Sequence, residues 1–397
     1  MDITVYPHRL SGSVQVIPSK SQAHRLLICA AFADKPTELI CRETNRDIEA
    51  TADCLTALGA KIMRTDTGYR VFPVVEVPQE ATLNCKDSGS TLRFMLPIVG
   101  ALGVNGKFHL EGRLPNRPLS PLREEMERMG CSVFFENENT LCCNGKLRSG
   151  AYRIDGSVSS QFITGLLFAL VLMDAECELE ITGKVESRPY IDLTMHALQL
   201  FNTQLDGKYI HPSLSLKSPG AVEVEGDWSN GAFFLAANAL GSNLQISGLS
   251  AVSAQGDKLC KDILEKKDFI QISCKDIPDL VPILAIYAAA NKGGQFADIA
   301  RLRLKESDRV QSVCDMLLAL GIHTYADENT LTVAPGKFSG GTVDAANDHR
   351  IAMASAIAAT IASGPVTILG ADCVAKSYPA FWDIYRNLGG VYEQYLR

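Results

Sequence analysis

The chain has 397 residues, of which 46% are hydrophobic and 21% charged, and its formal net charge is −7. These values exclude a disordered, collagen-like or low-complexity chain, and they argue against a surface that binds nucleic acid or an anionic membrane over its whole extent. The length exceeds what one ordinary core accommodates, so we expect one large or two medium domains.

The chain shows no sign of export or membrane insertion. Its N-terminal segment lacks the charged and apolar regions of a signal peptide. The longest apolar runs, 163–173 and 280–290, are shorter than the ~18 residues of a membrane span. Twelve cysteines include no Cys-x-x-Cys pair, which argues against a zinc ribbon or a disulfide framework. We expect a soluble, cytoplasmic protein with reduced thiols.

Six segments share one design, in which a short run rich in Ser, Asn or Asp opens an apolar helix rich in Ala or Leu. They begin at residues 19, 88, 157, 228, 278 and 347, so that successive starts are 69, 69, 71, 50 and 69 residues apart. Because these helices are apolar nearly all round, we expect them to be buried. The regular spacing indicates an internal repeat.

A second, more amphipathic helix is expected after most of the apolar ones. It stops at Gly or Asn, the residues that favour a left-handed helix cap. The stops are Gly59, Gly130, Asn202, Gly321 and Gly389, whereas in the fourth repeat 258–267 has no such stop. Between the helices, alternating or β-branched runs such as 69–72 and 330–333 predict strands.

This order of elements predicts an α/β fold of six repeats. Two lobes of three repeats are the most economical arrangement, with a crossing of the chain near 224–226. We expect lobe one to comprise residues 1–18 and 226–397, and lobe two to comprise residues 19–225.

Cations gather at the starts of the apolar helices, where the helix dipole alone would disfavour them. Because a helix N-terminus already offers free N–H groups, this placement indicates anion sites, whereas a merely solvated face would place cations near helix C-termini. The residues concerned are Lys20, Arg25, Arg93, Arg309 and Arg350.

Two further segments carry charge. Residues 301–305 alternate Arg or Lys with Leu, which predicts a strand with three cations on one face and two leucines facing the core. A solvent-facing strand with Ser307 as a helix N-cap is the alternative. Asp279, after Pro278, is expected in a first helical turn, as a capping acid or, beside cations, as a candidate base. His349 is equally well a structural histidine or a contact residue.

Longer motifs run through essentially the whole chain, and in them the sequence resembles the enolpyruvyl transferases, specifically the branch that acts on shikimate 3-phosphate. The motifs are Ser19-Lys-Ser-x-x-His-Arg25, Ser88-Gly-Ser-Thr-x-Arg93, Arg117-Pro-Leu, Gly156-Ser-Val-Ser-Ser-Gln161, Ser187-Arg-Pro-Tyr190, Pro278-Asp279, Arg303-Leu-Lys-Glu-Ser-Asp-Arg309, Asp348-His-Arg350 and Lys376. The chain departs from the family at Ile17-Pro18, where Pro-Gly is usual, and at 86–90, where Lys-Asp-Ser-Gly-Ser replaces Gly-Asn-Ala-Gly-Thr. The resemblance implies a two-lobed inside-out α/β barrel of six βαβαββ units, three per lobe, with the helices inside.

The resemblance also implies the reaction and its substrates. The enolpyruvyl group of phosphoenolpyruvate passes to the 5-hydroxyl of shikimate 3-phosphate, with release of phosphate, in aromatic amino-acid biosynthesis. Lobe two is the shikimate 3-phosphate side and lobe one the phosphoenolpyruvate side. The residues implied for shikimate 3-phosphate are Lys20, Ser21, Arg25, Ser159, Ser160, Gln161, Ser187, Asp279 and Lys305. Those implied for phosphoenolpyruvate are Lys20, Gly89, Arg117, Gln161, Arg309, Arg350 and Lys376. We expect a monomer with no metal or organic cofactor and no nucleic-acid or membrane partner.

The implied mechanism is addition followed by elimination through a tetrahedral intermediate, which needs a base for the hydroxyl and an acid for carbon 3 of phosphoenolpyruvate. Asp279 is the expected base, because an acid at a helix start stays ionised. Glu306 and Lys20 are both candidates for protonating carbon 3 and for assisting the departure of phosphate. Asp87 would weaken cosubstrate binding unless it turns away or pairs with Lys86.

Two rival functions make different demands on the sequence. A UDP-N-acetylglucosamine enolpyruvyl transferase would carry a cysteine in the loop that is 111–117 here, and this loop has none. An inactive relative that only binds an anion would have no need of Lys20, Asp279 and Glu306 together.

Overall fold

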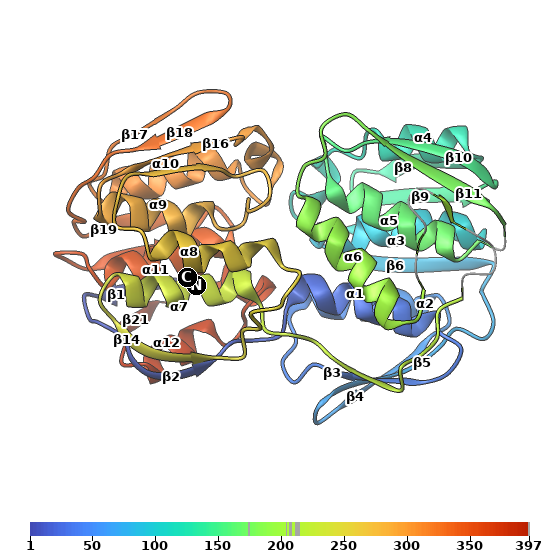
Figure 1. The fold of residues 1–397 in the computed structure, drawn as a ribbon, viewed down its shortest axis with the longest axis horizontal. Helices are drawn as coiled ribbons and strands as arrows, with labels where there is room; N and C mark the ends of the chain where they lie inside the picture. Colours follow the sequence, from blue (N-terminus) through green and yellow to red (C-terminus); the bar gives the residue numbers. More distant parts are fainter. Residues whose placement is uncertain (174, 204, 206–208, 211–214, 396–397) are drawn as a thin grey trace. The chain divides into compact units, whose positions relative to one another are not determined.

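The computed structural model describes residues 1–173, 175–203, 205, 209–210 and 215–395. The chain forms two compact units, each drawn in Figure 1. Unit 1 is Met1–Ile17 with Gly226–Arg397, and unit 2 is Pro18–Glu225. The chain therefore passes from one unit to the other twice, after Ile17 and after Glu225.

Unit 2 contains three sheets among its described residues. The first has the strand order β13-β3-β5-β4, from β3 (Thr37–Ile40), β4 (Lys61–Thr65), β5 (Gly68–Phe72) and β13 (Ala221–Glu223). The second has the order β6-β7-β9-β8, from β6 (Glu80–Lys86), β7 (Asn105–Leu110), β8 (Cys131–Asn137) and β9 (Thr140–Gly145). The third has the order β10-β11-β12, from β10 (Gly150–Asp155), β11 (Cys177–Thr182) and β12 (Tyr209–Ile210).

Unit 1 also contains three sheets among its described residues. The orders are β19-β20-β1-β21, β15-β16-β18-β17 and β14-β2. Their bounds are β1 (Asp2–Tyr6), β2 (Ser11–Gln15), β14 (Asn243–Ser247), β15 (Ile270–Ser273), β16 (Gly294–Ala297), β17 (Thr324–Ala326), β18 (Thr330–Val333), β19 (Gly341–Asp344), β20 (Val366–Leu369) and β21 (Val391–Tyr395). The strands predicted at 69–72 and 330–333 are therefore confirmed.

One pairing scheme recurs in the sheets. A parallel pair, such as β6 with β7 or β10 with β11, is extended on one side by an antiparallel strand. The parallel pairs β15 with β16 and β19 with β20 of unit 1 are extended in the same way. Parallel strands need a crossover connection, and a long apolar helix supplies it in each of these four pairs.

The two chain crossings exchange strands between repeats. Strand β2 precedes the first apolar helix in sequence but pairs with β14, and β13 precedes the fourth apolar helix but pairs with β3. Each unit therefore contains the strand that comes just before the chain crosses out of it, which is β2 in unit 1 and β13 in unit 2.

The six apolar helices form as predicted (Figure 1). Their residues are mostly buried. They are α1 (Lys20–Ala31), α3 (Gly89–Leu102) and α5 (Ser160–Val171) in unit 2, and α7 (Trp228–Ala239), α9 (Val281–Ala290) and α11 (His349–Ala359) in unit 1. Each set forms the centre of its own hydrophobic core. Ser19, Ser88, Ser159, Asp227 and Asp348 cap five of the starts with a side-chain oxygen.

The second helices are α2 (Arg46–Ala57), α4 (Leu122–Arg128), α6 (Arg188–Leu200), α8 (Cys260–Leu264), α10 (Arg309–Ala319) and α12 (Phe381–Asn387). All five expected stops have positive φ, at Gly59, Gly130, Asn202, Gly321 and Gly389. The prediction of left-handed caps is therefore confirmed, and it was secure because a cap depends on local backbone sterics.

Two sequence predictions were wrong. Residues 301–305 form no strand, because Ala300–Leu304 is a 3₁₀ turn, η3, in which Leu302 is buried while Leu304 is 45% exposed. Asp279 lies in a turn ahead of α9 and does not cap it, since α9 begins at Val281 with no side-chain cap. The burial of Leu302 in the first segment, and the arginine contacts of Asp279 in the second, replace the regular element that the local pattern predicts.

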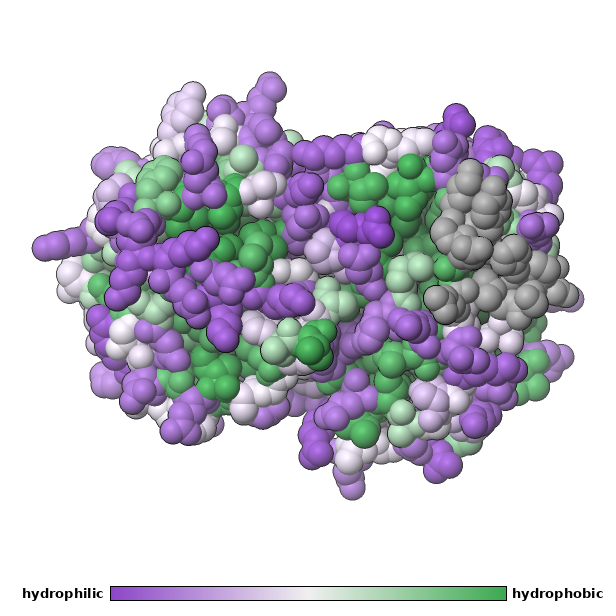
Figure 2. All heavy atoms as spheres, in the orientation of Figure 1, coloured by the Kyte–Doolittle hydropathy of each residue, from purple (hydrophilic) through white to green (hydrophobic). Residues whose placement is uncertain are grey.

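Hydrophilic side chains interrupt the apolar ones on the visible faces of the units (Figure 2). Among the described residues, no helix combines the length and the apolar character that crossing a bilayer requires. All twelve cysteines are free thiols, and ten of them are buried.

Candidate active site

Unit 1 contains a buried cluster of charges around Arg309, which has no exposed side-chain surface. Its Nε donates to Asp348 Oδ2 at 2.9 Å, its Nη1 to Asp279 Oδ1 at 2.8 Å and its Nη2 to Glu306 Oε2 at 2.7 Å. Burial disfavours the charge on Arg309, but the three carboxylates outweigh it and hold the pKa above its usual range. Arg309 therefore stays a cation that links three separate segments.

Asp279 is the residue on which the cations of unit 1 converge. Besides Arg309, it accepts from Arg350 Nη2 at 3.1 Å and lies 3.7 Å from Lys305 Nζ. Burial alone would raise the pKa of Asp279, yet Arg350, Lys305 and Arg309 together lower it well below its usual range. The carboxylate is ionised, but it is a weak base as long as all three cations face it.

Lys305 reaches Asp279 because of the 3₁₀ turn that the sequence did not predict. With about three residues per turn, Leu302 and Lys305 leave the turn on the same side, and the Lys305 amide donates to the Leu302 carbonyl at 3.4 Å. Leu302 anchors that side in the core. Burial lowers the pKa of Lys305 to about 8, against the attraction of Asp279.

The N-terminus of α11 is organised by Asp348, a carboxylate with no exposed surface. It accepts from the Arg350 amide at 3.0 Å and from Ser307 Oγ at 3.1 Å, in addition to Arg309. His349 is 1% exposed at the start of the same helix. Lys376 ends the 3₁₀ helix η4 (Ala371–Lys376) and is 9% exposed.

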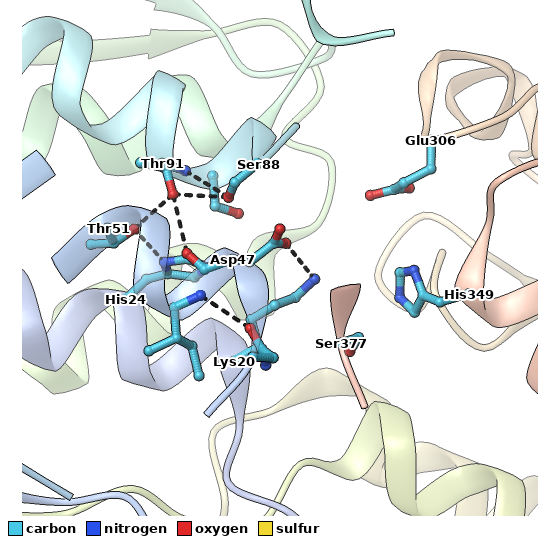
Figure 3. A network of polar contacts seen from close by, with 12 residues as sticks. Lys20, His24, Asp47, Thr51, Ser88, Thr91, Glu306, His349 and Ser377 are labelled. Carbon is cyan, nitrogen blue, oxygen red and sulfur yellow. Dashed lines mark hydrogen bonds and ion pairs between the residues drawn. The ribbon is translucent and has the colours of Figure 1, made fainter. Parts of the chain in front are cut away.

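In unit 2, Lys20 opens α1 directly after its N-cap, Ser19. The Lys20 Nζ donates to Asp47 Oδ2 at 2.8 Å, and Figure 3 shows the two side chains pointing toward each other. Both are mostly buried, at 13% and 5% side-chain exposure. If either partner moved away, the other charge would be buried without compensation. The pair therefore holds the Lys20 ammonium in one place.

Gly89, the first residue of α3, lies under two guanidinium groups. A Cβ at this position would lie 2.7 Å from Arg117 Nη1 and 3.2 Å from Arg93 Nη1. Gln161 adds an amide, since its Oε1 accepts from Arg93 at 2.6 Å and its Nε2 donates to Ser90 Oγ at 2.9 Å. The absence of a side chain at Gly89 thus brings two cations over a helix N-terminus, an arrangement that suits a phosphate or carboxylate.

Arg25 is bound mainly by the protein itself. Its guanidinium donates to Thr194 Oγ1 at 2.9 Å, the Ser21 carbonyl at 2.5 Å, Thr164 Oγ1 at 3.3 Å and the Tyr190 carbonyl at 2.8 Å. An arginine has five N–H donors, so one Nη1 N–H has no acceptor among the described residues and can serve a ligand. Burial lowers the pKa of Arg25 to about 10.

The predicted serines stand at two further helix starts in unit 2. Ser159 is the N-cap of α5 and accepts from the Gln161 amide at 3.3 Å, and Ser160 is the first residue of that helix. Ser187 precedes α6 with a φ of 56°. A non-glycine residue in this conformation stores strain, which is common where a side chain is aimed at a ligand.

The replaced loop at 86–90 has an unusual backbone as well. Lys86 has a φ of 50°, and its Nζ lies 3.5 Å from Asp53 Oδ2. The Lys86 ammonium is thus engaged by an acid of α2. The loop 111–117 contains a short 3₁₀ turn, η1 (Leu114–Asn116), and carries Arg117 toward Gly89.

Three site carboxylates escaped the sequence predictions: Asp47, Asp257 and Asp348. They contact other protein groups, and their partners lie 27, 28 and 39 residues away, so local patterns cannot reveal them. Asp348 offered one signal, since it stands directly before His349 and Arg350 in a quoted motif. Asp257, in η2 (Gly256–Leu259), offered none.

Comparison with known proteins agrees with this picture. The family model described as EPSP synthase (3-phosphoshikimate 1-carboxyvinyltransferase) matches residues 5–385. The chain is 34% identical to the 3-phosphoshikimate 1-carboxyvinyltransferase of Clostridium beijerinckii, covering 99% of each chain, and 35% identical to that of Clostridium kluyveri, covering 99% of this chain and 98% of the relative.

Solved structures show the same fold at lower identity. An EPSP synthase from Acinetobacter baumannii superimposes with a TM-score of 0.79 at 22% identity, covering 99% of this chain and all of that one. The enolpyruvyl transferase NikO from Streptomyces tendae gives 0.75 at 17% identity, covering 99% and 98%. The match of the family model and the full-length relatives show that the chain belongs to the EPSP synthase (3-phosphoshikimate 1-carboxyvinyltransferase) family, transferases of the shikimate pathway to aromatic amino acids.

Proposed function

We propose that the chain transfers the enolpyruvyl group of phosphoenolpyruvate to the 5-hydroxyl of shikimate 3-phosphate, by addition and elimination through a tetrahedral intermediate. The observation that carries the proposal is Asp279, an ionised carboxylate held by Arg309, Arg350 and Lys305. A binding protein for anions would gain nothing from a carboxylate among its cations, whereas a transferase needs a base there. We also propose that the six repeats form the inside-out α/β barrel of the family, with three repeats in each lobe.

Shikimate 3-phosphate would be held mainly by unit 2. Ser159, Ser160 and Ser187 supply hydroxyl and backbone donors at helix starts, which suits a phosphate that wants several donors from fixed positions. Arg25 contributes its one remaining N–H and otherwise positions α1. The rest of the proposed contacts are Lys20, Ser21, Gln161, Asp279 and Lys305.

Phosphoenolpyruvate would bind mainly to arginine and lysine side chains of both units. In unit 2, the guanidinium of Arg117 over Gly89 favours an anionic oxygen at that position. The other proposed contacts are Lys20, Gln161, Arg309, Arg350 and Lys376. This much positive charge is needed because the two substrates are both highly anionic and repel each other.

The proposed base becomes effective only when the cosubstrate is bound. In the present structure Arg309 and Arg350 both donate to Asp279, which lowers its pKa well below the usual range. An incoming anion that shares these guanidinium groups neutralises part of their charge, so the pKa of Asp279 rises and the carboxylate can accept the proton of the 5-hydroxyl.

Two groups remain candidates for the proton that carbon 3 gains. Glu306 accepts from Arg309 at 2.7 Å in unit 1, and Lys20 donates to Asp47 at 2.8 Å in unit 2. The cations then stabilise the charge of the tetrahedral intermediate without a covalent bond to the protein.

The test is phosphate release from phosphoenolpyruvate by the purified protein, with shikimate 3-phosphate or UDP-N-acetylglucosamine as acceptor. We expect release only with shikimate 3-phosphate, and a loss of at least about 100-fold in kcat for Asp279→Asn and Asp279→Ala, the scale of general base catalysis. Asp308→Asn is the matched control, because Asp308 is the partly exposed N-cap of α10 and asparagine caps equally well. Release with neither acceptor would contradict the proposed reaction, and a fully active Asp279→Asn would contradict the role of base alone.

A further inference from the structure

Helices α1 and α2 of unit 2 are joined by two polar contacts that lie one helical turn apart. The first is the pair of Lys20 with Asp47. The second is His24 Nδ1 with Thr51 Oγ1, at 2.7 Å. Both partners of the second contact stand four residues after those of the first, so the two contacts follow one face of each helix (Figure 3).

A third helix joins this pair through Thr91 of α3. Its Oγ1 lies 2.7 Å from Thr51 Oγ1 and donates to Ser88 Oγ at 2.8 Å, and it lies 3.4 Å from the Asp47 carbonyl (Figure 3). His24, Thr51, Ser88 and Thr91 have no exposed surface. Thr91 thus touches the backbone of the residue that holds Lys20, and it sits two residues after Gly89.

The hydrogen bonds that link His24, Thr51 and Thr91 have one consistent direction of donation. Burial lowers the pKa of His24 to about 3, so the ring is neutral and carries one N–H. The other ring nitrogen, Nε2, is buried and has no hydrogen-bond partner among the described residues. A buried N–H without an acceptor costs more than an unused lone pair, so the proton belongs on Nδ1. His24 then donates to Thr51, Thr51 to Thr91, and Thr91 to Ser88 or the Asp47 carbonyl.

We propose that Thr51 and Thr91 are positioning residues for phosphoenolpyruvate, which fix the Lys20–Asp47 pair relative to Gly89 at the start of α3. This inference rests on the proposed function, which gives Lys20 and Gly89 the same ligand. The hydroxyls do not touch the substrate. They fix the spacing of three helix ends, because each β-branched side chain has few rotamers and each hydroxyl has a buried partner on another helix.

The test compares Thr91→Val, which removes the hydroxyl and keeps the shape, with the rescue variant Thr91→Ser. The matched control is Thr37→Val, since Thr37 Oγ1 lies 2.7 Å from Ser218 Oγ and is equally buried, but Thr37 stands on β3 and on none of the three helices. Both valine variants remove one buried hydroxyl of unit 2, which makes three contacts at Thr91 and one at Thr37. A purely structural role would lower the free energy of unfolding of both variants and would leave the Kd for phosphoenolpyruvate unchanged in both.

We expect Thr91→Val to raise the KM and the calorimetric Kd for phosphoenolpyruvate about tenfold, which corresponds to ~1.4 kcal/mol. Thr91→Ser should restore binding, and Thr37→Val should bind as the wild type does. Thr51→Val should act in the same direction, and it decides the question if Thr91→Val does not fold.

Three outcomes would overturn the proposal: unchanged phosphoenolpyruvate binding in Thr91→Val, an equal loss in Thr37→Val, or no rescue by Thr91→Ser. The binding measurement separates this proposal from the proposed function. A wild type that binds phosphoenolpyruvate without releasing phosphate would contradict the reaction, and the ratio of Kd values would still decide the positioning role. A wild type that does not bind phosphoenolpyruvate would contradict both.

Discussion

Asp257 is a buried carboxyl near the charges of unit 1, and its pKa is unusually high. It is 3% exposed and accepts a hydrogen bond from Ser229 Oγ at the start of α7. Burial, followed by the charge of Asp279, raises its pKa to about 7, against the opposing effect of Arg350. In its neutral form this acid does not compete with Asp279 for the cations.

The raised pKa predicts how stability changes with pH. Because the folded state binds this proton more tightly than the unfolded state, the stabilisation is fully present below the ordinary pKa near 4 and is lost as pH rises through about 7. From pH 5 to pH 8 the wild type should lose about 2 to 3 kcal/mol of unfolding free energy more than Asp257→Asn does, at about 1.4 kcal/mol per pKa unit. Urea denaturation at the two pH values measures this difference.

The exposed acid Asp262 on α8 supplies the control, since Asp262→Asn should keep the pH dependence of the wild type. Equal pH dependence in the wild type and in Asp257→Asn would show that Asp257 is ionised throughout this range.

Individual site residues differed in how far the sequence could identify them. Lys20, Arg309 and Arg350 stand out because cations at helix starts conflict with the dipole, and a local conflict of that kind is visible in a sequence. Asp47 and Asp348 do not stand out, because an acid in a first turn has an ordinary local reason to be there. Only the folded chain shows that each is paired with a cation far away in sequence.

At the scale of elements, Gly165 of α5 lies directly against the backbone of α3. A Cβ at Gly165 would collide with the Arg93 carbonyl and would lie 2.8 Å from Pro97 Cγ. Gly165 stands one turn after Gln161, whose amide bonds Ser90 and Arg93. The missing side chain therefore sets the helix spacing at which Gln161 reaches the start of α3.

Gly165→Ala should destabilise the protein by about 1 to 3 kcal/mol, the usual cost of overpacking, although alanine favours a helix more than glycine does. It should also raise the KM for phosphoenolpyruvate, because α5 must move away from α3. Thermal unfolding and kinetics measure the two effects. Gly364→Ala is the control, since its Cβ would meet only ordinary contacts at 3.5 Å, and it should be within about 0.5 kcal/mol of the wild type. If Gly165→Ala were more stable than the wild type, there would be room for a Cβ between Gly165 and the Arg93 carbonyl, contrary to this prediction.

Elements with local causes were predicted well, and those with tertiary causes were not. The six apolar helices and the five glycine or asparagine stops follow from periodicity and backbone sterics. The 3₁₀ turn at 300–304 and the turn at Asp279 do not, because Leu302 is buried in the core of unit 1 and Asp279 is held by Arg309 and Arg350, which are far away in sequence. The alternation of cations and leucines at 301–305 contains no information about such contacts.

At the scale of the whole molecule, the spacing of the apolar helices reflects repeated sheets. The one short separation, 50 residues, falls in the fourth repeat, where α8 has five residues and β14 has only β2 as a partner in the described sheet. The sequence signalled that this repeat is different. It could not signal that β2 and β13 are exchanged at the two crossings, because strand pairing is decided by the folded chain.

A transferase passes the enolpyruvyl group to its acceptor, whereas a hydrolase would only break down phosphoenolpyruvate. Phosphorus NMR of one reaction mixture separates the two reactions, since phosphoenolpyruvate, shikimate 3-phosphate, the enolpyruvyl product and inorganic phosphate each carry one phosphorus atom. We expect equal loss of both substrates and equal gain of phosphate and of the enolpyruvyl ether, with none of these changes when UDP-N-acetylglucosamine replaces shikimate 3-phosphate. Phosphate that appears while shikimate 3-phosphate remains unchanged would show hydrolysis and rule out the transfer.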